Sequence, residues 1–200
     1  MDDATEASYR EMLRCIKYVV DTPDRGLKVE PKSLKEFVWE LVLWTDSDWG
    51  GDKEDRRSIS GFMLFLNGVL ISWRSRSQRQ VALSSSEAEF YACSEAVKEI
   101  PFVVQILLFL GVPVELPVVV KVDNIGAIFM TENATSSVKT RHMDMRYRYV
   151  VELQNSGLIK TTFVPTKLNV SDVETNNVTG EVQDANIDVY SSEKKALEIE

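Results

Sequence analysis

The sequence is poor in the residues that build disulfides, thiolate metal sites and membrane segments. It contains two cysteines, Cys15 and Cys93, and one histidine in 200 residues. These cysteines give neither a disulfide framework nor a zinc-ligand spacing, so we expect them to be reduced in an intracellular protein. No apolar run reaches the roughly 18 residues of a transmembrane helix. The opening MDDATEASYREM has no basic region followed by an apolar one, so we expect no signal peptide.

Basic residues are also in the minority, which at first argues against a nucleic-acid partner. The net charge is −8, but residues 168–200 hold eight acids and two bases and contribute −6 of it. The remaining 167 residues carry 23 acids and 21 bases. A nearly neutral body can still carry local basic strips, and the local field is what a phosphate meets. Nucleic-acid binding therefore stays open, and the hydrophobic content of 44% indicates a globular protein.

Helical and strand patterns alternate along the chain. The spacing of apolar residues predicts four helices. The first covers 6–20, the second follows the serines at 84–86 and ends at Gly111, and the last two cover 124–131 and 140–154. Pro101 is expected to kink or split the second of these helices. Residues 37–79 predict three antiparallel strands with a hairpin turn at Asn67-Gly68, and 116–122 and 158–164 predict two further strands. We therefore expect an α/β fold with a mixed five-stranded sheet, three antiparallel strands followed by parallel ones, and helices on its faces.

Acidic residues stand at the ends of the predicted core strands. Asp46 ends the first strand, in WTDSDW, and Asp123 follows the apolar run LPVVVKV. Because ligands of open α/β sheets bind at the carboxyl ends of strands, we expect both to face one crevice. Glu87 and Glu89 stand in the first turn of the long helix, and Asp172 follows the last strand. Converging carboxylates favour a hard cation such as Mg²⁺, although each residue alone is more commonly a helix cap or a turn residue.

Four segments carry a family resemblance. They are WTDSDWGGDKEDRRSISGFMLFLNGVLISWRSRSQRQVALSSSEAEFYACSEAVKE, VKVDNIGAI, KTRHMDMRYRYV and GLIKTTFVPT. In this order and spacing they resemble the ribonuclease H domain of Copia-type (Ty1/copia) retrotransposon polyproteins, over roughly residues 8–173. MLRCIKYVVDTPDRGLKV resembles the connection that precedes that domain. The resemblance implies a ribonuclease H-like fold and cleavage of the RNA strand of RNA–DNA hybrids with two Mg²⁺ or Mn²⁺ ions, without an organic cofactor.

The resemblance also assigns the metal ligands, residue by residue. The first aspartate of the family falls on Asp46, which would bridge both ions, and the third and fourth acids fall on Asp123 and Asp172. The family pattern of a glutamate, an aromatic residue or leucine, any residue and alanine fits Glu89 rather than Glu87. The sequence after Asp172 departs from the family pattern. We thus expect a connection helix and linker over 1–36, a ribonuclease H-like domain over 37–173 and an acidic, poorly ordered tail over 174–200.

Three arginines are candidates for binding the hybrid. Arg74, Arg76 and Arg79 lie within six residues with no acid between them. Most such runs are solvated faces, but they suit contact with a sugar–phosphate backbone, which needs no base reading. The partner that the resemblance implies is an RNA–DNA hybrid, and we predict no membrane partner; the sequence does not define an oligomeric state.

Two other functions compete with the hybrid nuclease. A transposase or integrase of the same fold places a glutamate last, whereas the order here is Asp46, Glu89, Asp123 and Asp172, which disfavours it. The other alternative is a catalytically inactive remnant of such a polyprotein that keeps the fold and nucleic-acid binding.

Overall fold

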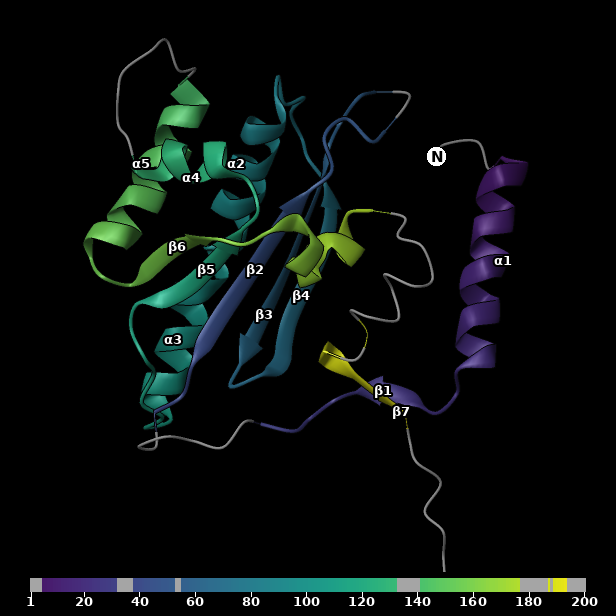
Figure 1. The fold of residues 1–200 in the computed structure, drawn as a ribbon, viewed down its shortest axis with the longest axis horizontal. Helices are drawn as coiled ribbons and strands as arrows, with labels where there is room; N and C mark the ends of the chain where they lie inside the picture. Colours follow the sequence, from purple (N-terminus) through teal and green to yellow (C-terminus); the bar gives the residue numbers. More distant parts are fainter. Residues whose placement is uncertain are drawn as a thin grey trace, which may run out of the picture.

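A mixed five-stranded sheet forms the centre of the protein (Figure 1). The computed structural model describes residues 5–31, 38–52, 55–132, 141–176, 187 and 189–193. The strands are β2 (Leu41–Ser47), β3 (Ile59–Leu66), β4 (Val69–Ser77), β5 (Val118–Val122) and β6 (Ile159–Phe163), in the spatial order β4-β3-β2-β5-β6. β2 pairs antiparallel with β3 and parallel with β5, and β6 is parallel to β5. The expected mixed sheet of the ribonuclease H-like fold is therefore confirmed.

The β3–β4 hairpin turns where the sequence predicts it. Asn67 and Gly68 both have positive φ angles, 50° and 85°. A two-residue turn of this kind matches the twist of the flanking strands. The pairing of Leu66 with Val69 follows directly.

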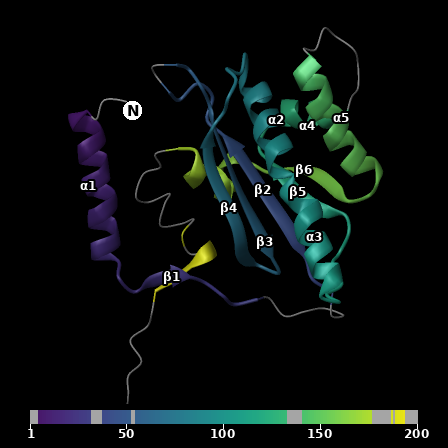
Figure 2. The same ribbon diagram turned by 180° about the vertical axis from the view of Figure 1, so that it is seen from behind.

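Four helices accompany the sheet: α2 (Ser85–Ala96), α3 (Glu99–Phe109), α4 (Ile125–Glu132) and α5 (Arg141–Asn155). The long helical pattern after Ser84 is split, as Pro101 suggested, but the break lies at Val97 and Lys98. Pro101 itself is the third residue of α3, where a missing N–H costs no hydrogen bond. Figure 2 shows α2 and α3 lying over the sheet on the side opposite to the C-terminal segment.

Alternation along β3 supplies apolar side chains to both faces of the sheet. Phe62 and Leu64 join the core under the helices. Met63 and Phe65 join a second cluster on the other face, which Val170 completes. The sheet is therefore covered on both faces, and the cover of the second face comes from residues beyond the last strand of the sheet.

Residues beyond the last strand of the sheet cover this second face, and one of them, Tyr190, belongs to the tail that was expected to be poorly ordered. The 3₁₀ helix η2 (Val170–Glu174), which follows a shorter one, η1 (Thr166–Leu168), lies against it and crosses the boundary expected at 173/174. A short strand β7 (Ser191–Glu193) pairs antiparallel with β1 (Arg25–Leu27), and Tyr190 packs on the second cluster. The described residues beyond 173 thus make specific contacts, while a poorly ordered tail over 174–200 stays a prediction. Low apolar content does not prevent order where a few residues cover an apolar sheet face. The other domain boundaries stay predictions, and 32–37, at the first of them, lie outside the described residues.

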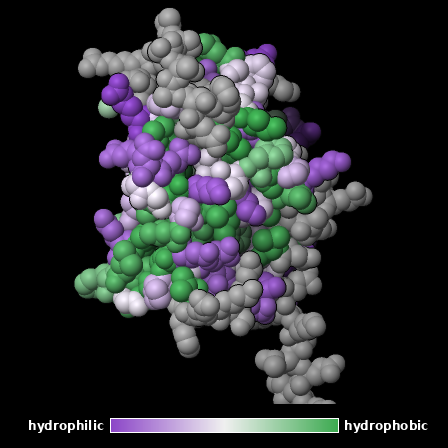
Figure 3. All heavy atoms as spheres, turned by 60° about the vertical axis from the view of Figure 1, so that its left-hand side comes forward, coloured by the Kyte–Doolittle hydropathy of each residue, from purple (hydrophilic) through white to green (hydrophobic). Residues whose placement is uncertain are grey.

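Groups of several exposed apolar side chains are found on two helices. Helix α1 (Glu6–Asp21) buries none of its residues and stands apart from the sheet in both ribbon views (Figures 1 and 2). On α3 the exposed apolar residues are Phe102, Ile106, Leu108 and Phe109. Figure 3, which brings the side of α3, α4 and α5 forward, shows hydrophobic surface in its lower part. No described helix has both the length and the hydropathy to cross a membrane.

Candidate active site

Two neighbouring parallel strands bring the first two acids together. β2 and β5 pair in the register Val42 to Val119 and Trp44 to Lys121. Continued by two residues, this register sets Asp46 level with Asp123 at the carboxyl ends of both strands. Side chains alternate along a strand, so the two carboxylates share one side of the sheet edge.

Helix α2 supplies the third acid. Ser84 caps its N-terminus by accepting a hydrogen bond from the Glu87 N–H at 3.2 Å. The Glu87 carboxylate accepts the N–H of Leu83 at 2.7 Å and the hydroxyl of Tyr91 at 3.1 Å. Glu87 is therefore used in fixing the start of the helix. Glu89, two residues on, points to the sheet and is buried.

Asp46, Glu89 and Asp123 converge on one point. Each offers a carboxylate oxygen, and these three oxygens lie within 4.8 Å of one another. Asp46 and Glu89 are only 3% and 5% exposed, and Asp123 is half-buried. Three acids this close together and this well buried repel one another unless they are protonated or share a cation.

Hydrogen bonds hold the carboxylates of Asp46 and Glu89 in place. Asn169 Nδ2 donates to Asp46 Oδ1 at 3.1 Å, and the Thr175 hydroxyl donates to Asp46 Oδ2. Glu89 Oε1 accepts both the N–H and the hydroxyl of Ser47 at 3.0 Å. Glu89 Oε2 is buried and has no hydrogen-bond partner among the described residues.

The pKa values follow from burial and from mutual repulsion. Burial raises the pKa of Glu89 to about 9, and the charges of Asp46 and Asp123 add to the shift. Burial likewise raises the pKa of Asp46 to about 7, against the lowering effect of the Thr175 hydrogen bond. The pKa of Asp123 is also raised, chiefly by burial. Without a cation, the site resists carrying three negative charges.

The residues present fit a divalent cation. The donor set consists of carboxylate oxygens, which Mg²⁺ and Mn²⁺ prefer. Glu89 Oε2, buried without a partner, is an acceptor that a cation would satisfy. This arrangement can hold a cation at the edge of the sheet.

Comparisons with known proteins were made for the sequence and for the fold. No family model matches the sequence. It is 28% identical over 171 residues to the retrovirus-related Pol polyprotein from transposon RE2 of Arabidopsis thaliana, covering 86% of this chain and 12% of the relative. It is 34% identical over 135 residues to that from transposon TNT 1-94 of Nicotiana tabacum, covering 68% of this chain and 10% of the relative. The chain is homologous to Copia-type retrovirus-related Pol polyproteins of transposons.

The chain thus spans about a tenth of the Pol polyproteins it matches. Among solved structures, LC11-RNase H1 in complex with RNA/DNA hybrid aligns with 73% of this chain and 99% of its own, at a TM-score of 0.49 and 13% identity.

The fourth acid assigned by the Pol resemblance stands apart from the other three. Asp172 lies in η2, and its Oδ1 accepts a hydrogen bond from Asn176 Nδ2 at 2.7 Å. Its charge raises the pKa of both Asp46 and Asp123, so it faces the same region. It is not part of the group of mutually close carboxylates. Asp48, the neighbouring acid on β2's extension, accepts the N–H of Ile59 and is not part of that group either.

The three candidate arginines lie at and after the end of β4 and are exposed. They line a pocket of about 360 Å³ between β4, α2 and α5. Arg74 pairs with Glu99 at 2.7 Å and stacks on Phe62 at 5.3 Å. No ion pair of Arg76 or Arg79 is found within the described ranges.

Sequence reasoning missed the residues that hold the acids in place. Asn169 is 1% exposed and donates to Asp46 and to the Thr45 carbonyl oxygen. Thr175 falls in the segment that was expected to be disordered. A polar residue gives no sequence signal of burial when it lies outside a periodic element. Only the position of Asn169 shortly after the last strand could have suggested it.

Proposed function

We propose that this chain is a metal-dependent endonuclease that hydrolyses the RNA strand of RNA–DNA hybrids within a Copia-type polyprotein. The observation that carries the proposal is the convergence of Asp46, Glu89 and Asp123 at the carboxyl ends of β2 and β5, with Glu89 Oε2 buried and unpartnered. Homology to Pol polyproteins supports the same reaction class. The proposed setting is intracellular, and no organic cofactor is needed.

The protein's own groups would bind and orient two Mg²⁺ or Mn²⁺ ions. Bound ions would supply Lewis-acid stabilisation of the charge that develops on the scissile phosphate. The resemblance implies that Asp46 would contribute to both ion positions, and it lies within reach of both Glu89 and Asp123. Asn169 and Thr175 donate hydrogen bonds to its two oxygens. The carboxylate can therefore bind an ion without reorganising.

Asp172 is proposed as the fourth ligand. Its place in η2, near enough to raise the pKa of Asp46 and Asp123, supports a role at the rim of the site. The hydrogen bond from Asn176 orients its carboxylate. We further propose that Arg74, Arg76 and Arg79 contact the hybrid backbone, since they are exposed and line one pocket.

Incubation of the purified chain with a hybrid labelled on its RNA strand tests the proposal. Cleavage is expected with millimolar Mg²⁺ or Mn²⁺ and none with EDTA. The same RNA as a single strand, and the same sequence as duplex DNA, are the substrate controls. Asp123→Asn is expected to remove cleavage, because it removes one charged ligand.

The inactive remnant remains the second candidate. It would bind the hybrid without cutting it and would gain no thermal stability from divalent cations. An active nuclease gains stability from millimolar Mg²⁺ or Mn²⁺, since the ions bind only the native arrangement. Cation-dependent melting thus separates the two candidates independently of the cleavage assay.

A further inference from the structure

Helix α3 is apolar on two opposite faces. Ile100, Val104 and Leu107 repeat at helical spacing and are buried in the main core. On the opposite face, which we call the outer face of α3, Phe102 is 62% exposed and Phe109 is 90% exposed. The other exposed apolar side chains of α3 and its C-cap are Ile106, Leu108 and Leu110. A helix that is apolar all round is normally buried all round, so the outer face requires a cover that the described residues do not supply.

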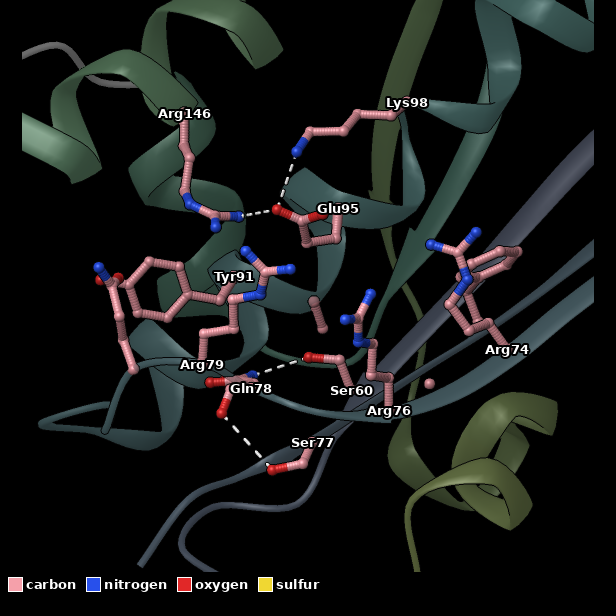
Figure 4. Close-up of a pocket in the computed structure, with 14 residues that line it drawn as sticks. Ser60, Arg74, Arg76, Ser77, Gln78, Arg79, Tyr91, Glu95, Lys98 and Arg146 are labelled. Atoms are coloured by element: carbon pink, nitrogen blue, oxygen red, sulfur yellow. Dashed lines mark hydrogen bonds and ion pairs between the residues drawn. The ribbon is translucent and has the colours of Figure 1, made fainter.

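The outer face of α3 is also free of charge. Residues 100–114 contain no Asp, Glu, Lys or Arg. Lys98, the N-cap of α3, binds Glu95 Oε1 at 2.8 Å, and Arg146 binds the same oxygen, beside the arginine pocket (Figure 4). The charges at the start of α3 therefore belong to a contact with α2 and α5. Depletion of charge with enrichment in aromatic residues is typical of the core of a protein–protein interface.

The exposed apolar surface of α3 is large enough for a specific contact. At about 200 Å² for a fully exposed aromatic side chain and somewhat less for leucine and isoleucine, the exposed parts of its five side chains come to roughly 600 Å². Two copies that cover each other's surface would bury roughly 1,200 Å² in all, the lower end of stable protein–protein interfaces. Hydrophobic surface is visible in the lower part of Figure 3, on the side of the molecule that carries α3.

The sequence of the outer face is self-complementary. Phe102 stands three residues before Gln105, and Phe109 stands three residues after Ile106. Two copies of α3 that lie antiparallel across a twofold axis between positions 105 and 106 therefore bring Phe102 of each to Phe109 of the partner subunit. Gln105 then lies at the axis beside its counterpart, where the two amides can donate to and accept from each other.

The helix dipoles favour the same antiparallel arrangement. The last turn of α3 has no basic residue, so its negative end is not compensated by its own side chains. An antiparallel partner sets the positive N-terminus of one helix beside the negative C-terminus of the other. A parallel pair would place like ends together and would not bring Phe102 to Phe109.

We propose that the outer face of α3 is a self-association surface through which two copies of this chain pair antiparallel. The pairing covers the apolar surface of both helices and leaves the three clustered acids accessible, since Glu89 lies near the start of α2 and α3 begins beyond its end. The inference does not depend on the proposed function.

Sedimentation equilibrium of the purified chain tests the pairing. The mean mass should rise from the 22.7 kDa of the chain toward twice that value, with a dissociation constant on the order of 10 µM for so small an interface. Phe109→Lys should weaken the dimer at least about tenfold, the loss typical of a central aromatic contact. Because position 109 is 90% exposed and a base in the last turn suits the dipole, the monomer should stay folded by circular dichroism. Val19→Lys, 67% exposed on α1, is the matched control and should leave the dimer unchanged.

A charge swap tests the antiparallel arrangement. Phe102→Glu alone should weaken the dimer as Phe109→Lys does. In the Phe102→Glu/Phe109→Lys variant, the acid at 102 of each copy faces the base at 109 of the other, so part of the lost affinity should return at low salt and disappear at high salt. A double variant that binds no better than the single variants would overturn the arrangement.

Three results would overturn the self-association itself. One is a parent chain that stays monomeric at concentrations of several hundred µM, as expected if another part of a polyprotein covers α3. The second is a dimer that Phe109→Lys leaves intact. The third is loss of the dimer in Val19→Lys, which would place the contact on α1. Cleavage of the hybrid, or its absence, bears on the proposed function alone.

Discussion

Replacing Asp46 by asparagine should stabilise the metal-free protein. The aspartate is 3% exposed and lies beside two further acids. Asparagine has the same shape, its Oδ1 can still accept from Asn169, and its amide can donate to the Thr175 hydroxyl in place of the reverse bond. The substitution therefore removes a buried charge while the surrounding hydrogen bonds survive.

The expected magnitude follows from the pKa of Asp46. The folded protein raises this pKa from 3.8 to about 7. Three units at about 1.4 kcal/mol each set an upper limit of about 4 kcal/mol for the lost stability. The carboxyl is neutral in both folded and unfolded chains below pH 3.8, so no cost exists there. Between about pH 4 and pH 7 Asp46 ionises in the unfolded chain but not in the folded one, so the loss of folding stability grows with pH. Above about pH 7 the loss is constant.

Urea unfolding in EDTA between pH 4 and pH 8 measures this effect. We expect Asp46→Asn and the parent to be equally stable at pH 4. At pH 8 the variant should be more stable by about 2–4 kcal/mol, a midpoint shift of about 1–2 M urea at a typical slope of about 2 kcal/mol per M. Asp24→Asn, at an exposed turn position, is the control and should show no pH-dependent gain.

Divalent cations should cancel most of this difference in stability. With Mg²⁺ at a hundredfold excess over its dissociation constant, the parent gains about 2.7 kcal/mol from binding to the native state. The variant lacks the central carboxylate and should gain little. A variant that is less stable than the parent at pH 8 in EDTA, or a gain that is the same at pH 4 and pH 8, would refute the reasoning.

Three further substitutions probe the remaining parts of the site. Glu89→Gln should abolish the Mg²⁺-dependent rise in melting temperature, whereas Glu87→Gln should keep it and lose about 1 kcal/mol from the weakened helix start; the opposite result would exchange their roles. Gly61→Ala would place a Cβ 2.8 Å from Thr175 Cγ2, so urea unfolding should show a loss of about 1–3 kcal/mol, and an unchanged midpoint would contradict the close docking of η2. Asn169→Ala should cost about 1–3 kcal/mol from unpaired buried groups and weaken Mg²⁺ binding in the same melting assay, while unchanged binding would show that Asn169 does not position the carboxylate.

The sequence predicts the frame of the site because strand ends and helix starts leave strong local patterns. Three such patterns depend only on neighbouring residues. They are the apolar run before Asp123, which predicts a strand, the Asn67-Gly68 turn, which predicts a hairpin, and the serines before Glu89, which predict a helix start. The prediction of Glu89 rather than Glu87 as a ligand rests on the family pattern. The structure gives a physical reason for the same distinction, because the Glu87 carboxylate accepts the N–H of Leu83 at the start of the helix.

The parts that sequence reasoning could not supply depend on contacts between distant segments. Asn169 and Thr175 lie more than 120 positions from Asp46, and neither belongs to a periodic element. Composition indicated disorder beyond residue 173. Among the described residues there, Tyr190 nevertheless packs on the apolar face that Met63 and Phe65 form with Val170. The gathering of Arg146, Lys98 and the β4 arginines in one pocket is likewise a tertiary effect.

The most direct test of the account is single-turnover cleavage of an RNA–DNA hybrid labelled on its RNA strand, with the parent chain and Asp46→Asn compared at equal hybrid saturation. We predict Mg²⁺-dependent cutting of the RNA strand by the parent and none by the variant, although both bind the hybrid. Equal cutting by both proteins, or no cutting by a parent chain that binds both the hybrid and Mg²⁺, would contradict the assignment of Asp46, Glu89 and Asp123 as the catalytic centre.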